Sequence, residues 1–224
     1  MGYTKGQVIG GRWKPLHYML ARSLYTNVMA TCGGGKHNPW GYNSCYVTND
    51  GIDAFAGEVV IEAVPLASGA AVPAPFVLPV QLPPGPGVKH WFRIPDAMWA
   101  LGKGGGHVFK STVTQSDDTA AAVVASHHVL LPAPPQFLTG LAVANVTATV
   151  EAAETGEAVK IIVAADTLAL YVTLSTLAQG RFSDNCFMVE EGKTVELEFV
   201  EFPGFDLVEL KSSLKVEHLA KNMM

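Results

Sequence analysis

The chain has 224 residues, of which 49% are hydrophobic and 16% charged, and its formal net charge is −5. This acidic balance argues against proteins that bind the nucleic-acid backbone through a basic face. No apolar run reaches the roughly 18–20 residues that a membrane span requires, and the N-terminal residues lack the basic-then-apolar order of a signal peptide. The sequence therefore predicts no membrane span and leaves the compartment open.

The first predicted element is one amphipathic helix over residues 15–28. A proline suits the first helical turn, where its missing N–H is not needed, and a run of three glycines at 33–35 follows the pattern. The apolar face repeats every four residues, at Leu16, Leu20, Leu24 and Val28. We expect residues 1–31 to form a leader and this helix.

Strand patterns follow the helix. Alternating or continuous apolar runs rich in β-branched residues predict strands over 43–49, 54–64, 88–94, 107–114 and 120–131. The proline-rich stretch 65–87 predicts a loop with an edge strand, because proline has no N–H to donate to a neighbouring strand. Residues 96–101 predict a helical turn. We expect a first β-sandwich over residues 32–131.

The sequence PAPP at 132–135 predicts a stiff connector and a domain boundary. Beyond it, short strand patterns recur with turn signals between them, over 141–151, 158–164, 168–174, 187–189, 195–200 and 214–219. Residues 132–224 are therefore expected to form a second sandwich of roughly seven strands. The predicted fold is mainly β, with one N-terminal helix followed by two tandem β-sandwich domains.

The sequence offers no pattern of catalytic or metal-ligating residues. The seven histidines lack helical i, i+4 spacing and paired cysteine motifs, so no metal site and no cofactor is predicted. Glu196 and Glu198 lie two apart in a strand pattern, which indicates one solvated sheet face. No pair of carboxylates is recognisable as the acid and nucleophile of a hydrolase.

The cysteines and aromatic residues each leave two interpretations. Cys32 and Cys45 are able to pair around a glycine-rich loop, but free, mostly buried thiols are favoured for a chain with three cysteines. The four tryptophans, at 13, 40, 91 and 99, suit either a sugar-stacking platform or core packing, and core packing is favoured. Trp40 and Tyr42, in KHNPWGYN (36–43), are the candidates for sugar stacking.

Three stretches resemble β-mannosidases of glycoside hydrolase family two. GRWKPLHYMLARSLY (11–25) is similar to the segment that opens the last helix of the catalytic barrel in that family. GRFSDNCFMVEEGKTVELEF (180–199) resembles the signature GRFSDNGF of the C-terminal immunoglobulin-like domain. LPAPPQFLTGLAVANVTATV (131–150) is similar to the entry into that domain, and the motifs follow in the family's order.

The resemblance implies that the two sandwiches are immunoglobulin-like and that the helix packs on a (β/α)₈ barrel. The family's two catalytic glutamates precede the GRWK segment, so no position of this chain is expected to be catalytic. The interface with a partner is expected at Trp13, Leu16, Leu20, Leu24 and Val28. A structural turn is expected at Arg181, Ser183, Asp184 and Asn185, where the last two suit side-chain to backbone hydrogen bonds. We expect Arg181 to pair with Asp184 or to reach a neighbouring domain.

Three functions follow from these observations. The first is a non-catalytic C-terminal region that braces or docks onto a β-mannosidase barrel. The second is a stand-alone scaffold subunit of a larger assembly, derived from such an enzyme. The third is a carbohydrate-binding module for a mannose-containing glycan. The expected partner is a protein, either the barrel or other subunits.

Overall fold

The computed structural model describes residues 8–9, 12–13, 26–32, 43–85, 88–115, 122–130, 133–151 and 158–223. The chain divides into two compact units. One comprises residues 20–141. The other comprises residues 142–224 and the hairpin of β1 (Val8–Ile9) and β2 (Arg12–Trp13).

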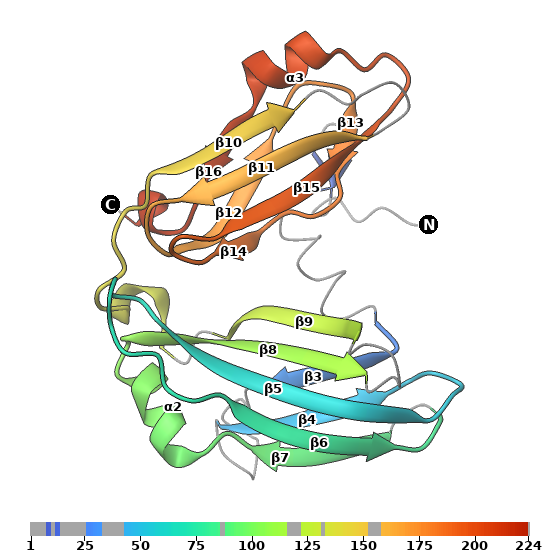
Figure 1. The fold of residues 1–224 in the computed structure, drawn as a ribbon, viewed down its shortest axis with the longest axis vertical. Helices are drawn as coiled ribbons and strands as arrows, with labels where there is room; N and C mark the ends of the chain where they lie inside the picture. Colours follow the sequence, from blue (N-terminus) through green and yellow to red (C-terminus); the bar gives the residue numbers. More distant parts are fainter. Residues whose placement is uncertain are drawn as a thin grey trace. The chain divides into compact units, whose positions relative to one another are not determined.

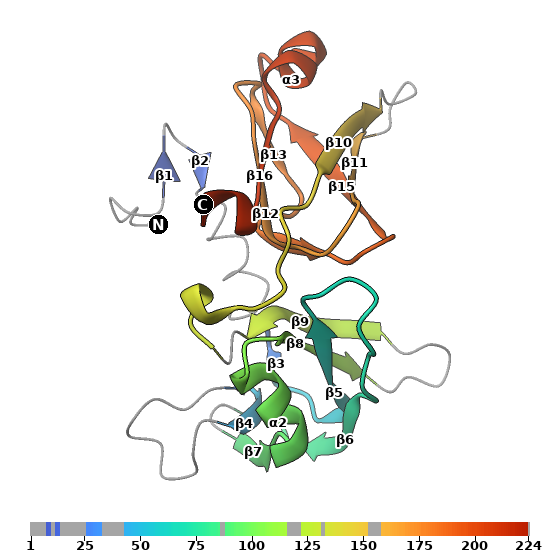
Figure 2. The same ribbon diagram turned by 90° about the vertical axis from the view of Figure 1, so that its left-hand side faces the viewer.

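The first unit is a sandwich of two antiparallel sheets, which form its two layers in Figures 1 and 2. One sheet has the order β3 (Val28–Cys32), β4 (Ser44–Asn49) and β7 (Val88–Arg93). The other has the order β6 (Phe76–Leu82), β5 (Phe55–Pro65), β8 (His107–Gln115) and β9 (Ala122–Leu130).

Strand β5 shows why this sequence forms a half-buried strand. Alternate residues from Phe55 to Ala63 are buried, and those between them are exposed or half-buried, as expected when successive side chains point to opposite faces. Gly57 occupies one inward position because a Cβ there would lie 2.1 Å from the carbonyl oxygen of Thr114 on β8. Val59 and Ile61 fill the core between the sheets.

The proline-rich region contains the predicted edge strand. Among the described strands, β6 pairs with β5 alone, and its Pro79 lies opposite Glu58. Proline is tolerated at this position because the strand has a free edge. The predicted helical turn is the helix α2 (Asp96–Lys103), whose Trp99 stacks on Phe109 with ring centroids 5.6 Å apart. Trp99 is thus one of the tryptophans used for packing.

The chain after β9 remains attached to the first unit. Its 3-10 helix η1 (Pro135–Phe137) is followed by Thr139, whose N–H donates to the carbonyl oxygen of Gly105 over 2.8 Å. Gly105 has φ +80°, and a Cβ there would lie 2.1 Å from the carbonyl oxygen of Phe137. The division between the units falls after Leu141, later than the PAPP sequence suggests.

The second unit is also a sandwich of a four-stranded and a three-stranded sheet (Figure 1). The larger sheet has the order β10 (Val146–Glu151), β11 (Val159–Ala165), β15 (Thr194–Glu201) and β13 (Gly180–Phe182). The smaller has the order β14 (Phe187–Val189), β12 (Ala169–Ser175) and β16 (Lys215–Glu217). Helix α3 (Leu207–Ser213) and the 3-10 helix η2 (Ala220–Asn222) flank β16 in sequence.

The core of the second sandwich lies between its two sheets. Ile161 of β11, Leu174 of β12 and Phe199 of β15 are almost fully buried there, and Leu210 joins them from α3. Helix α3 begins at a capping residue, Asp206, whose Oδ1 accepts from the N–H of Val208 over 2.8 Å. The predicted mainly-β fold with two sandwiches is confirmed, while strands β1, β2, β3 and β13 and helix α3 were not predicted.

The predicted helix is wrong at its C-terminal end. Val28 is the first residue of strand β3, and its side chain is buried in the first sandwich with 7% exposure. Its neighbours Ala30 and Val47 belong to the same core. The four-residue spacing therefore continued into a strand, where an inward-facing valine also satisfies the apolar pattern. Residues 14–25 of the predicted helix lie outside the described residues.

Candidate functional site

The segment that joins β13 to β14 carries the predicted structural turn. Its first residue, Ser183, extends the β13–β15 pairing: its N–H donates to the carbonyl oxygen of Glu198 over 2.7 Å. The Ser183 Oγ accepts from the N–H of Glu198 over 3.0 Å. The serine side chain thus supplies the acceptor that a further backbone carbonyl would supply in a longer strand.

Asn185 connects this segment to the opposite sheet. It is 3% exposed, and its Nδ2 donates to the carbonyl oxygen of Leu174 over 2.7 Å. Its Oδ1 accepts from the N–H of Leu174 over 2.8 Å and from the N–H of Cys186 over 3.0 Å. Since Leu174 belongs to β12, this side chain joins the crossing segment to the three-stranded sheet.

Asp184 and Arg181 take different positions. Asp184 is 5% exposed, and its Oδ1 accepts from the N–H of Asn185 over 2.8 Å. Arg181 is exposed on β13, between the buried residues Gly180 and Phe182. Because strand residues alternate between faces, the Arg181 side chain points away from the core that Phe182 enters.

Two residues near this turn have backbone conformations that normally favour glycine. Cys186 has φ +61°, and Tyr171 on β12 has φ +52°. Cys186 stands where the signature GRFSDNGF has glycine. Glycine suits that position because it adopts a positive φ without steric cost. Burial, with the nearby Asp184 carboxylate, raises the pKa of the Cys186 thiol to about 11. Burial, with the nearby Cys186, raises the pKa of Tyr171 to about 12.

These groups are therefore held in their neutral forms at physiological pH. A thiol is nucleophilic as its thiolate, and the raised pKa of Cys186 disfavours that form. The arrangement of Ser183, Asp184, Asn185 and Cys186 fixes a chain crossing between two sheets, and its chemistry is hydrogen bonding to the backbone.

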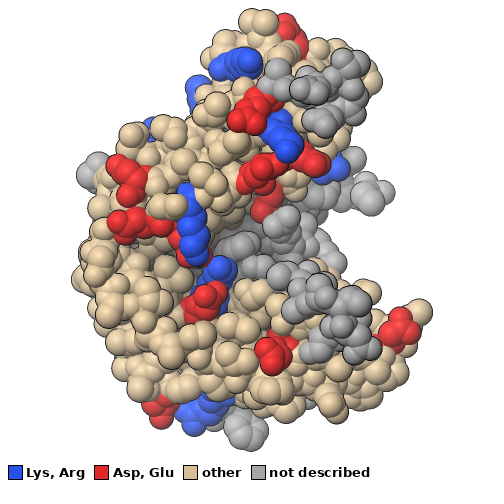
Figure 3. All heavy atoms as spheres, viewed as in Figure 1, with Lys and Arg blue, Asp and Glu red and all other residues tan. Residues whose placement is uncertain are grey.

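The outer face of the four-stranded sheet carries the carboxylates singled out in the sequence. Glu196 and Glu198 are both exposed, as predicted for a solvated face. The Nζ of Lys160 lies 3.0 Å from a carboxylate oxygen of Glu196. Figure 3 shows acidic and basic side chains interspersed over this unit. Among the described residues, no group of three or more His, Cys, Asp or Glu is placed to hold a metal ion.

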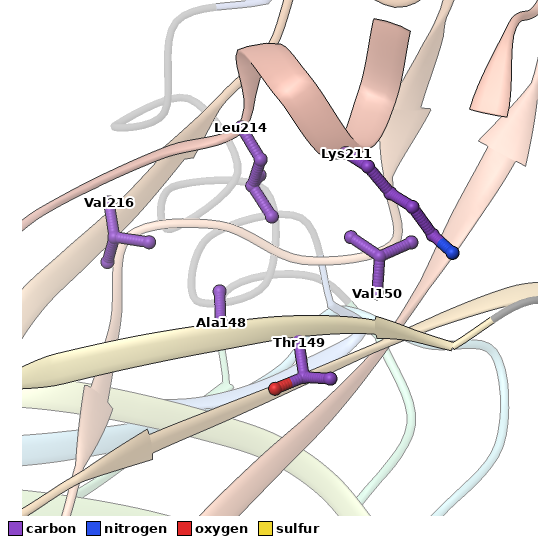
Figure 4. A pocket seen from close by; sticks show the side chains of 6 residues that line it. All are labelled: Ala148, Thr149, Val150, Lys211, Leu214 and Val216. Carbon is purple, nitrogen blue, oxygen red and sulfur yellow. The ribbon is translucent and has the colours of Figure 1, made fainter. Parts of the chain in front are cut away.

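A cleft of about 360 Å³ opens along one side of the second sandwich, where β10 faces the α3–β16 segment (Figure 4). Both β10 and β16 are edge strands of their sheets. The apolar side chains in the cleft are half-buried, and Thr149 and Lys211 are exposed beside them. The lining residues are Ala148, Thr149, Val150, Lys211, Leu214 and Val216.

The residues predicted for a partner interface are only partly within the described chain. Trp13 is the second residue of β2. Leu16, Leu20 and Leu24 lie outside the described residues, as do the sugar-stacking candidates Trp40 and Tyr42. Val28 is part of the core and is corrected from an interface residue to a packing residue.

The favoured interpretation of free thiols is wrong for two of the cysteines. Cys32 and Cys45 form a disulfide, with Cα atoms 4.1 Å apart. They are directly opposite each other on the antiparallel strands β3 and β4, which brings the two Cβ atoms within bonding reach. Cys186 is the free, buried cysteine that the sequence suggested.

Sequence reasoning missed two features of the sandwiches. His218, after β16, is 4% exposed and its Nδ1 has no hydrogen-bond partner within the described part of the chain. No spacing pattern in the sequence indicates that His218 is buried, because its burial depends on chain segments distant in sequence.

The second missed feature is an aromatic pair in the first sandwich. Tyr46 and Trp91 lie side by side on β4 and β7, with ring centroids 5.1 Å apart. The alternating pattern Ser-x-Tyr-x-Thr at 44–48 is the sequence feature that indicates an outward-facing Tyr46.

None of the described helices has the length and apolar character needed to cross a membrane.

Comparison with known proteins gives a family match for the second sandwich. No curated protein matches the chain. Residues 141–222 match the family model Ig_mannosidase, described as an Ig-fold domain, which includes the Ser183–Cys186 segment and the cleft beside β10. The second sandwich is thus an Ig-fold domain of the kind found in β-mannosidase-like enzymes.

Proposed function

We propose that this chain is a non-catalytic sandwich region of a β-mannosidase-like enzyme, where it braces or docks onto the catalytic barrel. The observation that carries the proposal is the match of residues 141–222 to the mannosidase Ig-fold domain. The resemblance of GRWKPLHYMLARSLY to the end of a family-two barrel supports the same assignment.

The geometry of the second sandwich supports a structural role. The signature residues Asp184 and Asn185 are buried and hydrogen-bond to the backbone. The carboxylates of Glu196 and Glu198 lie on an exposed sheet face, where Glu196 pairs with Lys160. A glycosidase needs two carboxylates that converge on one sugar. The environment of these residues suits stabilisation of a domain.

The docking surface in this proposal is the segment with Trp13, Leu16, Leu20 and Leu24. Val28 is left out because its side chain fills the first sandwich. An apolar stripe of this kind is stabilised when it is covered by another apolar surface. The barrel of a β-mannosidase is the occupant that the resemblance implies.

The first experiment isolates the protein from its source with an antibody against residues 142–224. We expect β-mannosidase activity on an aryl β-mannoside to co-precipitate, and little activity on the matching aryl β-glucoside. Absence of β-mannosidase activity, with unrelated subunits in the precipitate, would overturn the proposal in favour of the scaffold function.

A second experiment tests the docking surface in the same native protein. The double substitution Leu20→Asp and Leu24→Asp is expected to lower the co-precipitated activity severalfold, because charges would enter an apolar contact. The matched control is Ile52→Asp, since Ile52 is 92% exposed and a charge there has little to disrupt. Equal activity in both variants would remove this segment from the interface.

A further inference from the structure

The outer face of the sheet β3–β4–β7 has an unusual set of side chains. Because strand residues alternate, the core-facing positions of β4 are Cys45, Val47 and Asn49, and the intervening positions face outward. The strand register aligns these outward positions in rows. The three rows are Thr31, Tyr46 and Trp91; Met29 and Thr48; and Ser44 and Arg93.

The central row carries two aromatic rings on neighbouring strands. The rings of Tyr46 and Trp91 have centroids 5.1 Å apart and are tilted by 54°. Trp91 is 47% exposed, in contrast to Trp99, which packs against the core of the same sandwich. An indole left half in solvent presents a large apolar surface whose burial by a ligand is favourable.

Polar groups surround the rings on the same face. Arg93 is exposed, and its Nη2 donates to the Oδ1 of Asn43 over 3.1 Å and lies 3.8 Å from the Oδ1 of Asp96. Asn43 is held in turn, because its Nδ2 donates to the carbonyl oxygen of Ile94 over 2.9 Å. A guanidinium has five N–H donors, so this anchoring leaves donors for a ligand.

Two hydroxyl groups of this face are buried. Ser44 and Thr48 flank Tyr46 on β4, and each is 3% exposed. Neither Ser44 Oγ nor Thr48 Oγ1 has a hydrogen-bond partner within the described part of the chain. Buried polar atoms without a partner are costly, and they are found where water or a ligand completes the bonding.

We propose that the Tyr46–Trp91 face is a carbohydrate-binding surface, in which a hexopyranose ring stacks on Trp91. The C–H groups of a pyranose face carry partial positive charge and suit the negative face of an aromatic ring. The ring's hydroxyls both donate and accept, so they match a guanidinium such as that of Arg93 and hydroxyl side chains such as Thr31. The choice of β-1,4-linked mannose as the sugar rests on the proposed function.

This surface differs from the predicted pair Trp40 and Tyr42, which precede β4 in sequence. It uses one of the four tryptophans first noted in the sequence, together with a tyrosine that the strand register places beside it. Arg93, two residues after Trp91 in the sequence, supplies a group that binds hydroxyls on the same face.

The experiment titrates the full 224-residue chain with β-1,4-mannohexaose by calorimetry. We expect saturable binding that weakens at least tenfold in Trp91→Ala and is partly retained in Trp91→Phe, which keeps an aromatic ring. The matched control is Phe202→Ala, because Phe202 is an exposed aromatic residue of the second sandwich with 44% exposure. Unchanged affinity in Trp91→Ala, or no binding by the unmodified chain, would overturn the proposal.

A measurement on the unmodified chain covers the case in which Trp91→Ala fails to fold. The indole N–H resonance of Trp91, assigned by its disappearance in Trp91→Phe, is expected to shift as mannohexaose is added. An unshifted Trp91 resonance at saturating sugar overturns the proposal. Failure of this proposal can be told apart from failure of the proposed function. The titration detects sugar binding without any hydrolysis, and the immunoprecipitation detects β-mannosidase activity without any sugar binding by the sandwich.

Discussion

Asn185 and Leu174 are joined as two paired strand residues would be. The side-chain Nδ2 of Asn185 donates to the carbonyl oxygen of Leu174 over 2.7 Å, and its Oδ1 accepts from the N–H of Leu174 over 2.8 Å. The primary amide thus replaces a backbone peptide group where the chain passes from the four-stranded to the three-stranded sheet. A residue with both a donor and an acceptor on a short side chain is required there.

The substitution Asn185→Ala is therefore expected to destabilise the second sandwich by about 3 kcal/mol, since three buried hydrogen bonds contribute ~1 kcal/mol each. Urea unfolding followed by far-UV circular dichroism gives the change in free energy of unfolding. Hydrogen exchange at the Leu174 amide shows whether the loss is local to this contact.

The matched variant is Asp184→Ala, which removes the bond from Asp184 Oδ1 to the N–H of Asn185. We expect it to cost at least about 1 kcal/mol, which the loss of this hydrogen bond contributes. An unchanged unfolding midpoint for Asp184→Ala contradicts this account of the turn.

The backbone of Cys186 gives a second prediction. At φ +61° a side chain with a Cβ is strained by roughly 1–2 kcal/mol relative to glycine. We compare Cys186→Gly with Cys186→Ala, because both lose the sulfur and only the first relieves the strain. The glycine variant should be more stable by about 1 kcal/mol in urea unfolding. Equal stability of the two variants would show that the conformation costs little here.

Much of the fold was predictable because both sandwiches use regular alternation. Strand β15 shows it: Leu197 and Phe199 are buried, while Glu196 and Glu198, which alternate with them, are exposed. The edge position of β6 was predictable from Pro79, which a central strand would not tolerate. Such patterns are local, and a sequence displays them directly.

The remaining features depend on local signals that compete or on long-range contacts. Helix α3 has an Asp206 cap and a Glu209 three residues later, a capping pattern that its short length obscured. Val28 continued a helical spacing but belongs to a strand, because the partner strand β4 determines its conformation. The face that joins Tyr46 to Trp91 required the register of β4 and β7, which no local pattern gives.

The histidine at 218 predicts a pH dependence of the second sandwich. Burial lowers the pKa of His218 below its ordinary value of 6.5; the charge of Lys221 adds to this, and a backbone hydrogen bond with Ala144 opposes it. The unfolded chain then binds more protons than the folded chain as the pH falls below 6.5. The free energy of unfolding is therefore expected to decrease from pH 6.5 down to the folded pKa, and to lose nothing further from this group below it.

The variant His218→Gln tests this dependence, because glutamine keeps polar atoms and does not titrate. Urea unfolding of both proteins between pH 8 and pH 5 gives the difference in free energy at each pH. The difference should change between pH 6.5 and pH 5 and be constant above pH 7. A constant difference over the whole range would mean that the pKa of His218 is the same in both states.

The disulfide between Cys32 and Cys45 predicts a reduction-sensitive first sandwich. The two cysteines are 13 residues apart, and closing a loop of this size stabilises a fold by about 3 kcal/mol. A phosphine reductant should therefore lower the urea midpoint of the transition reported by tryptophan fluorescence, since Trp91 and Trp99 lie in this sandwich. The control is the double variant Cys32→Ala and Cys45→Ala, whose midpoint should be low and unaffected by the reductant. A midpoint of the unmodified chain that does not respond to reduction would show that this bond contributes nothing to the stability of the first sandwich.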